Sequence, residues 1–257
     1  MTVVVAPPYL TQEARHDWDL LQRQTLQAHP FDPGQADLLP DPARRWVLHT
    51  IAPGTAMLRA VVLSTHGTIK LGSWRRFRAT QVLLPLEGFV WSASACLGLL
   101  PVRGFDRYRA GAGEMRWRLL DAFSLMSGTG ADITRSAAGR LACEFVLAPA
   151  VALDPRVRWK ALDERRAVAS LPVGSQDHDV TMTIAPDGRL ESVTMDRWGN
   201  PDKGACRQHL FGIECEDETV FDGFTLPARI RGGWWPGTAR WPAGEFIRFT
   251  LDGALFR

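Results

Sequence analysis

From Leu58 onward the sequence consists of short runs in which apolar and polar side chains alternate, and turn residues separate these runs. In the run Met115–Leu119, for example, apolar residues alternate with Arg116 and Arg118. Successive side chains of a β-strand point to opposite faces, so each run predicts a strand with one solvated and one buried face. Helical patterns do not alternate with these runs, and no segment repeats at a fixed period. The pattern therefore indicates an antiparallel sheet.

The predicted fold class is mainly antiparallel β within an α+β arrangement. We expect about ten strands in one large curved sheet, a half-barrel or barrel, because a flat sheet of that size would have two long exposed edges. One long helix, at about 131–148, is predicted to pack on this sheet. Its apolar positions Ile133, Ala137, Leu141 and Phe145 have helical spacing, and Pro149 ends the pattern.

Residues 1–54 are predicted to form a helical N-terminal appendage and a linker, and residues 55–257 a single curved-sheet domain. The appendage begins with a helix from about Thr11 to Ala28, followed by a stretch rich in turn residues. In a short second helix, Asp41 is expected to cap the first turn. Within the sheet domain, His66-Gly67 is interpreted as a tight turn between two short strands.

Composition excludes several classes of protein. The formal net charge is only +2, so nucleic-acid binding is not expected. No apolar run approaches the roughly 20 residues that span a bilayer, and the beginning MTVVVAPPYL lacks the pattern of a signal peptide. We therefore predict a cytoplasmic protein without a membrane span.

The usual cofactor and metal motifs are also missing. The sequence has no glycine-rich phosphate loop, nucleophile elbow, H-E-x-x-H or C-x-x-C motif, so we predict neither a cofactor nor a metal. Cys206, His209, Glu214 and Cys215 are residue types that bind zinc, but they lack the short paired spacing of a zinc knuckle. Ordinary strand and loop residues remain the alternative for this segment.

Tryptophan is abundant, with ten residues in a chain of 257. These side chains either fill a wide core or line a cavity for an apolar ligand. In the second case, the candidate cavity walls are Trp91, Trp117, Trp159 and Trp198.

Two pairs of polar residues are candidates for proton transfer. Arg140 and Glu144 lie four residues apart on the predicted long helix, which is the spacing of a solvated ion pair. If that helix face points into the concave sheet, desolvation raises the pKa of Glu144, which then acts as a general acid or base. Asp106 and Tyr108 share a strand face and offer a carboxylate and a phenol, although surface hydrogen bonding explains them equally well.

Three polar residues are candidates for orienting a ligand. Arg140 is suited to an anionic group or a carbonyl. Gln81 shares a strand face with apolar residues, where it is either a satisfied core amide or a ligand contact. Arg197 and Trp198 are suited to clamping a ligand at a strand end, or else to capping the strand through cation–π packing.

Six short motifs are spread over the stretch from Trp46 to the C-terminus, which is about four fifths of the chain. They are Trp74-Arg75-Arg76-Phe77 with Ala79 and Gln81, Gly88-Phe89-Val90-Trp91, Asp106 and Tyr108 with Gly111 and Gly113, Arg135-Ser136-Ala137-Ala138-Gly139-Arg140 with Glu144, Asp196-Arg197-Trp198-Gly199-Asn200-Pro201, and Gly232-Gly233-Trp234-Trp235. With these motifs the chain resembles a bacterial family known as a domain of unknown function. The resemblance implies a fold similar in outline to half-barrel carriers of lipids, and it implies no reaction.

The leading functional hypothesis is that the curved sheet binds an apolar or amphipathic small molecule. The same cavity would allow a cofactor-free cyclase, isomerase or lyase that uses Glu144, Asp106 and Tyr108 for acid/base chemistry, for example in specialised metabolism. One alternative is a carrier of lipids or other hydrophobes, which needs no protonatable group. A second alternative is a structural or protein-interaction domain with Trp234-Trp235 as its contact patch. The oligomeric state stays open.

Overall fold

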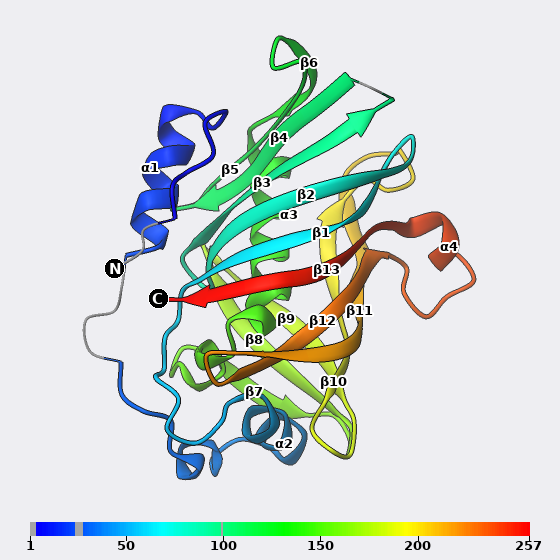
Figure 1. The fold of residues 1–257 in the computed structure, drawn as a ribbon. Helices are drawn as coiled ribbons and strands as arrows, with labels where there is room; N and C mark the ends of the chain where they lie inside the picture. The colour runs from blue at the N-terminus through cyan, green and yellow to red at the C-terminus, as the bar shows by residue number, and fades with distance from the viewer. Residues whose placement is uncertain (1–3, 24–27, 99) are drawn as a thin grey trace.

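In the part of the chain that the computed structural model describes, residues 4–23, 28–98 and 100–257, thirteen antiparallel strands form one continuous sheet (Figure 1). Neighbours in sequence pair from β1 to β6 and from β7 to β13, and β1 pairs with β13 where the two halves meet. The outermost strands, β6 and β7, are not paired with each other, so the sheet is curved but open. The strands are β1 (Val61–Leu71), β2 (Ser73–Leu84), β3 (Gly88–Leu97), β4 (Leu100–Arg109), β5 (Ala112–Leu119), β6 (Phe123–Gly128), β7 (Arg158–Ala161), β8 (Arg166–Val173), β9 (Gln176–Ile184), β10 (Leu190–Gly199), β11 (Arg207–Phe221), β12 (Phe224–Trp234) and β13 (Glu245–Phe256).

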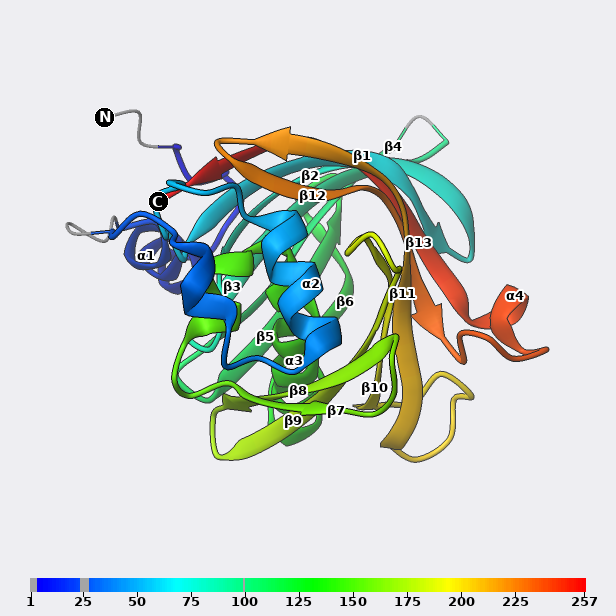
Figure 2. The same cartoon turned by 90° about the horizontal axis from the view of Figure 1, so that it is seen from below.

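Helix α3 (Ala131–Cys143) lies in the concave side of the sheet (Figure 2). It follows β6 in the chain and contacts β5 on one wall and β10 on the opposite wall. Glycine permits this close approach, because a Cβ atom at Gly113 would lie 2.7 Å from the backbone of Thr134. Two 3₁₀ turns, η2 (Glu144–Leu147) and η3 (Pro149–Leu153), lead from α3 to β7.

Helix α1 (Gln12–Leu21) packs on the convex face, against β2 and β3. Trp18 and Leu21 are buried there with Val82 and Val90. These two valines have the opposite strand parity to the residues of the concave face, so this part of the sheet is buried on both sides.

Helix α2 (Asp41–Thr50) lies at the end of the molecule opposite to the β5–β6 hairpin (Figure 1). Its Trp46 contacts Phe145 and Trp159, with ring centroids 5.7 and 6.3 Å away. This aromatic cluster closes that end of the concave space. The remaining short elements are η1 (Pro33–Ala36) before α2 and α4 (Trp241–Gly244) before β13. No helix in the described ranges is long and apolar enough to cross a membrane.

The structure confirms the predicted fold class and corrects the extent of its helices. The helix predicted at 131–148 ends at Cys143 and is followed by the 3₁₀ turn η2. Pro149 then prevents the α-helix from continuing, because it lacks a backbone donor and restricts the residue before it. The helix predicted at 11–28 begins at Gln12 and ends at Leu21, while residues 24–27 lie outside the described ranges. The cap predicted at Asp41 is wrong, because Pro40 occupies the N-cap position and Asp41 is already helical.

The turn predicted at His66-Gly67 is also wrong, since both residues lie inside β1. Gly67 is required there by a close strand contact, because a Cβ atom would lie 2.0 Å from the carbonyl oxygen of Arg248 in β13. His66 is exposed and its Nδ1 lies 2.7 Å from Oδ1 of Asp252.

The sheet has more strands than the alternation predicts. Strand β6 is exposed along nearly its whole length, so it shows no contrast between a wet and a dry face. The last strand, β13, extends over Glu245–Phe256.

Gly104 provides a test of how tightly the concave face is packed. A Cβ atom at Gly104 would lie 2.3 Å from the indole ring of Trp117 on the neighbouring strand. We expect Gly104→Ala to lower the free energy of unfolding by about 1–3 kcal/mol, measured by urea denaturation. The control is Gly253→Ala in β13, where no atom lies within 4 Å of the added Cβ and stability should not fall. Equal effects of the two substitutions would contradict the packing argument.

Candidate functional site

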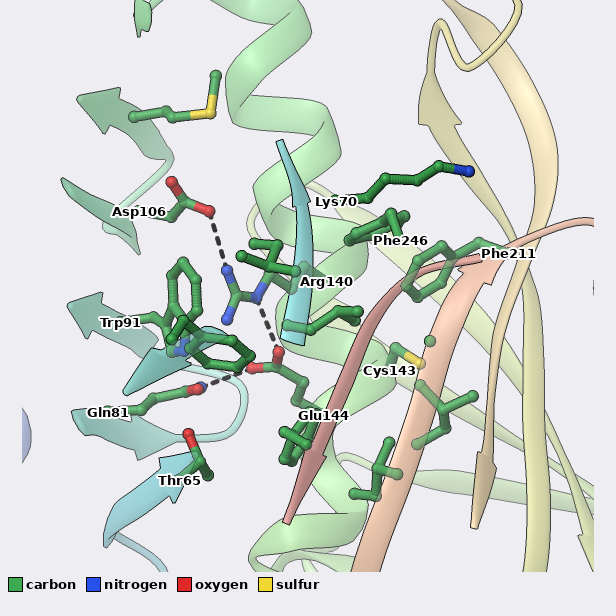
Figure 3. A pocket seen from close by; sticks show the side chains of 18 of the residues that line it. Thr65, Lys70, Gln81, Trp91, Asp106, Arg140, Cys143, Glu144, Phe211 and Phe246 are labelled. Carbon is green, nitrogen blue, oxygen red and sulfur yellow. Dashed lines mark hydrogen bonds and ion pairs between the residues drawn. The ribbon is translucent and has the colours of Figure 1, made fainter. Parts of the chain in front are cut away.

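A cavity of about 290 Å³ lies between α3 and the concave face of the sheet (Figure 3). Its walls are mostly apolar and aromatic, as in sites for small apolar ligands. The cavity extends from Leu63 and Leu147 toward Lys70, Met126 and Phe246, which lie at the end of the sheet opposite to α2. The other lining residues are Thr65, Ile69, Leu71, Phe77, Gln81, Trp91, Asp106, Met115, Trp117, Arg140, Cys143, Glu144, Arg197, Phe211, Ile213, Ile230, Gly232, Ile247 and Phe249.

The strand register places five of these residues in one row across β1–β5. Leu63 is opposite Gln81, Gln81 opposite Trp91, Trp91 opposite Asp106, and Asp106 opposite Met115. Side chains at directly opposed positions in an antiparallel sheet point to the same face. The row therefore brings an amide, an indole and a carboxyl group together on the concave wall.

Arg140 and Glu144 face this row from the helix side. Nε of Arg140 donates to Oε1 of Glu144 at 2.7 Å, and Nη1 donates to Oδ2 of Asp106 at 3.0 Å. Nε2 of Gln81 donates to Oε2 of Glu144 at 2.6 Å. Figure 3 shows the guanidinium group between the two carboxyl groups. The network thus ties the end of α3 to β2 and β4.

The aromatic rings beside Arg140 complete its surroundings. Its guanidinium carbon lies 4.7 Å from the ring centroid of Phe89 and 4.9 Å from that of Trp91. The indole Nε1 of Trp117 donates to Oδ1 of Asp106 at 3.3 Å. A cation over aromatic faces is favourable, and more so where water is scarce.

Burial dominates the ionisation of two groups in the cavity. It raises the pKa of Asp106 above its usual value, against the opposing effects of the Arg140 charge and the Trp117 hydrogen bond. Burial, reinforced by the charge of Arg140, lowers the pKa of Arg197 to about 10, so Arg197 is still protonated at neutral pH.

The hydrogen bonds limit what the two carboxyl groups can do chemically. Each oxygen of Glu144 already accepts a bond from a protein donor, and so does each oxygen of Asp106. These hydrogen bonds fix the two carboxyl groups in the polar part of the cavity wall. A proton donor is available only when Asp106 is protonated, which its raised pKa favours.

The sequence-predicted site residues fall into three groups. The cavity brings together Glu144, Asp106, Arg140, Gln81, Trp91, Trp117 and Arg197. Trp198 lies instead at a smaller cavity of about 70 Å³ beside Arg135 and His178. Tyr108 and Trp159 line neither cavity.

Tyr108 and Trp159 belong to the packed core instead. Tyr108 is 2% exposed, and its hydroxyl group lies close to Gly174. Trp159 packs against Trp46 and Phe145, and its Nε1 donates to the carbonyl oxygen of Ala152 at 3.0 Å. Tyr108 does share the inner face with Asp106, but it lies further along β4, beyond the cavity.

The sequence analysis missed several lining residues. Phe211, Ile213, Ile247 and Phe249 alternate along β11 and β13, so their strand parity was a usable signal. Lys70 has the parity of the outer face, so alternation gives no signal that it lines the cavity.

The zinc-type ligands form no metal cluster among the described residues, and two of the cysteines, Cys143 and Cys215, are buried. In the described ranges, no three His, Cys, Asp or Glu residues are placed to hold a metal ion, and this includes Cys206, His209 and Cys215. Cys143 lines the cavity, but burial raises its pKa to about 12, so the thiol stays protonated at neutral pH. Burial also raises the pKa of Cys215.

The raised pKa of Asp106 predicts how stability depends on pH. An acid whose pKa is higher in the folded state stabilises the fold most at low pH, and it loses this contribution as pH rises through the folded-state pKa. Asparagine has no such titration. We therefore expect the free energy of unfolding of the native protein to fall relative to that of Asp106→Asn between about pH 4 and pH 8, measured by urea denaturation.

Asp163→Asn is the control for this experiment. Hydrogen bonds from the backbone of Arg165 and the side chain of Arg166 lower the pKa of Asp163, so this group stays ionised over the whole range. The difference between native protein and control should be constant above about pH 5, where Asp163 is ionised in both the folded and the unfolded state. A constant difference for Asp106→Asn as well would contradict the burial of that carboxyl group.

The match of a family model confirms the family that the sequence motifs indicated. The chain has 12% identity to a domain from Vibrio parahaemolyticus assigned to outer membrane lipoprotein sorting, with a TM-score of 0.41 over 77% of this chain and 85% of that chain. It has 9% identity to a LolA superfamily protein from Nitrosomonas europaea, with a TM-score of 0.39 over the same shares, 77% and 85%. A comparison with curated proteins gives no match. The model of a family of unknown function, DUF6544, matches residues 29–246, and the protein therefore belongs to this family.

Proposed function

We propose that the protein binds an apolar or amphipathic small molecule in the cavity between α3 and the concave sheet. The supporting observation is the cavity itself, about 290 Å³ with apolar and aromatic walls and one fixed polar network. Ligand sites commonly combine such walls with a small number of convergent polar groups. The polar network would orient the ligand, and Trp91 and Trp117 would contact it.

Trp91 and Trp117 give a direct readout of occupancy. We expect saturable changes in tryptophan fluorescence when hydrophobes are added, together with an apolar molecule in native mass spectra of gently purified protein. Ile247→Phe, at a partly buried position in the wall, should weaken binding by about tenfold because the added ring occupies ligand space.

The matched control is Val220→Phe, at a position that is 65% exposed and outside the cavity. It should bind like the native protein. A clean mass without ligand, together with no fluorescence response to chemically diverse hydrophobes, would contradict the proposal.

A more specific proposal is that the protein also converts its bound ligand, as a cofactor-free cyclase or isomerase would. The observation in its favour is Asp106, a carboxyl group in the cavity whose burial raises its pKa toward the range of a general acid. Tyr108 is no longer a candidate, because it does not line the cavity. If the bound ligand is converted and Glu144→Gln with Asp106→Asn leaves conversion unchanged, these two residues are not the catalysts.

A carrier of hydrophobes would use the same cavity without turnover. The alternative of a protein-interaction domain at Trp234-Trp235 has less support. Trp234 packs on Phe211 with ring centroids 5.3 Å apart, and Arg240 lies 3.5 Å from the ring centroid of Trp235. Both indoles are therefore partly covered. A cytoplasmic location stays a prediction from the sequence.

A further inference from the structure

Arg197 is a cation in the cavity wall without a carboxylate partner. Among the described residues it forms no ion pair, whereas Arg140 in the same cavity pairs with both Asp106 and Glu144. Nε of Arg197 donates to the carbonyl oxygen of Ser136 at 3.0 Å, and Nη2 lies 3.2 Å from Oγ of Ser136. Nη1 has no hydrogen bond in the described part of the chain.

The guanidinium group of Arg197 is also fixed in place. Its central carbon lies 4.5 Å from the ring centroid of Phe211 and 5.5 Å from that of Trp234. The bonds to Ser136 hold it from the opposite side, on α3. The half-buried guanidinium group is therefore held at the cavity wall, where partial desolvation of a cation without an ion pair favours an anionic ligand.

We propose that the ligand of this cavity is an amphiphile with one anionic oxygen-bearing head group, a carboxylate or a phosphate, which binds Arg197. The inference rests on the proposed function and names its ligand class. The head group would accept hydrogen bonds from Nη1 of Arg197, and charge-assisted bonds of this kind are among the stronger ones. The tail would lie along Ile213, Ile230 and Ile247, which line the same cavity.

The test compares ligands that share a tail and differ only in the head group. Dodecanoic acid, dodecyl phosphate and dodecanol are titrated into the protein, with tryptophan fluorescence as the readout. We expect at least one anionic ligand to bind about tenfold or more tightly than the alcohol. The comparison of acid with phosphate identifies the head group.

Arg197→Met should retain binding of dodecanol and lose the preference for the anion. Arg197→Lys keeps the charge without the planar fork, so it should retain part of the preference. The control is Arg135→Met, an exposed arginine outside the main cavity whose guanidinium carbon lies 4.6 Å from the Trp198 ring centroid. This variant should behave like the native protein.

The outcomes separate the two proposals. Equal affinity of the native protein for acid, phosphate and alcohol overturns the anionic head group and leaves the proposed function standing. No binding of any of the three contradicts the proposed function. Loss of the preference in Arg135→Met but not in Arg197→Met would assign the head group to Arg135, on the smaller cavity that Arg197 also lines, and would overturn the role of Arg197.

A separate observation concerns the outer surface at the hairpin end of the sheet. The β1–β2, β3–β4 and β5–β6 hairpins lie together there (Figure 1), and we call this end the hairpin rim. Most of the large apolar side chains that are exposed in the described ranges gather on it. They are Trp74 (37% exposed), Leu100 (45%), Leu120 (45%), Phe123 (65%), Leu125 (49%) and Met126 (44%).

The hairpin rim is also basic and adjoins the cavity. Lys70, Arg76 and Arg118 form no ion pair among the described residues, and Asp121 pairs with Arg103. Met126 and Lys70 line the cavity as well, so apolar surface continues from the rim into the cavity. Apolar tips flanked by cations match the interface of a bilayer that carries anionic head groups.

We infer that the hairpin rim docks on an anionic lipid surface. A bilayer fits better than a protein partner because the apolar side chains belong to three separate hairpin tips and the cavity adjoins the same end. An apolar ligand could then pass between bilayer and cavity without crossing bulk water.

Co-sedimentation with phosphatidylcholine vesicles, with and without phosphatidylglycerol, tests this docking. We expect binding to the anionic vesicles that weakens with salt, and an about tenfold loss in Phe123→Ser with Leu125→Ser. The matched control is Leu38→Ser with Val220→Ser, at positions that are 98% and 65% exposed and lie elsewhere. No binding to either vesicle, or equal losses in both double variants, would overturn the inference.

Discussion

The dry concave face of the sheet needs a cover, and one helix supplies most of it. Strands lie about 4.8 Å apart, whereas a helix with its side chains is only about 10 Å across. Helix α3 therefore cannot fill the hollow of a sheet with thirteen strands. The aromatic cluster around Trp46 closes one end, and a cavity remains toward the other. The candidate site follows from this mismatch in width.

The polar network provides hydrogen-bond partners for the polar side chains that α3 brings into the hollow of the sheet. A helix that lies inside a sheet brings its own polar side chains into the hollow, where they need partners. Arg140 and Glu144 find them on the row of Gln81 and Asp106, which the strand register aligns. This network fixes α3 against one wall, while Arg197 contacts it from the opposite wall. The helix is therefore held from both sides. Of the two arginines in this contact region, Arg140 has carboxylate partners, whereas Arg197 on β10 forms no ion pair among the described residues.

Much of the fold was predictable because strand alternation is a local property. The dry face with Phe77, Gln81 and Trp91 and the helix that begins near 131 follow directly from spacing. Alternation failed where both faces of a strand share one environment. Strand β6 is wet on both sides, and Val82 is buried on the outer face because α1 covers it. Gly67 was mistaken for a turn because a close approach of β13 and a turn both require glycine.

The sequence alone determined the residue types, the alternation of apolar and polar side chains, and the spacing of Arg140 and Glu144. These local patterns predict an antiparallel sheet with one helix packed on it. Only the tertiary structure decided which polar residues meet. Asp106 and Tyr108 share a strand face, yet only Asp106 reaches the cavity, because α3 occupies a particular stretch of that face. Arg197 became significant only once β10 was placed beside Ser136, with no ion pair to Arg197 among the described residues. Strand register and helix position are set by the packing of distant segments, and local spacing carries no information about them.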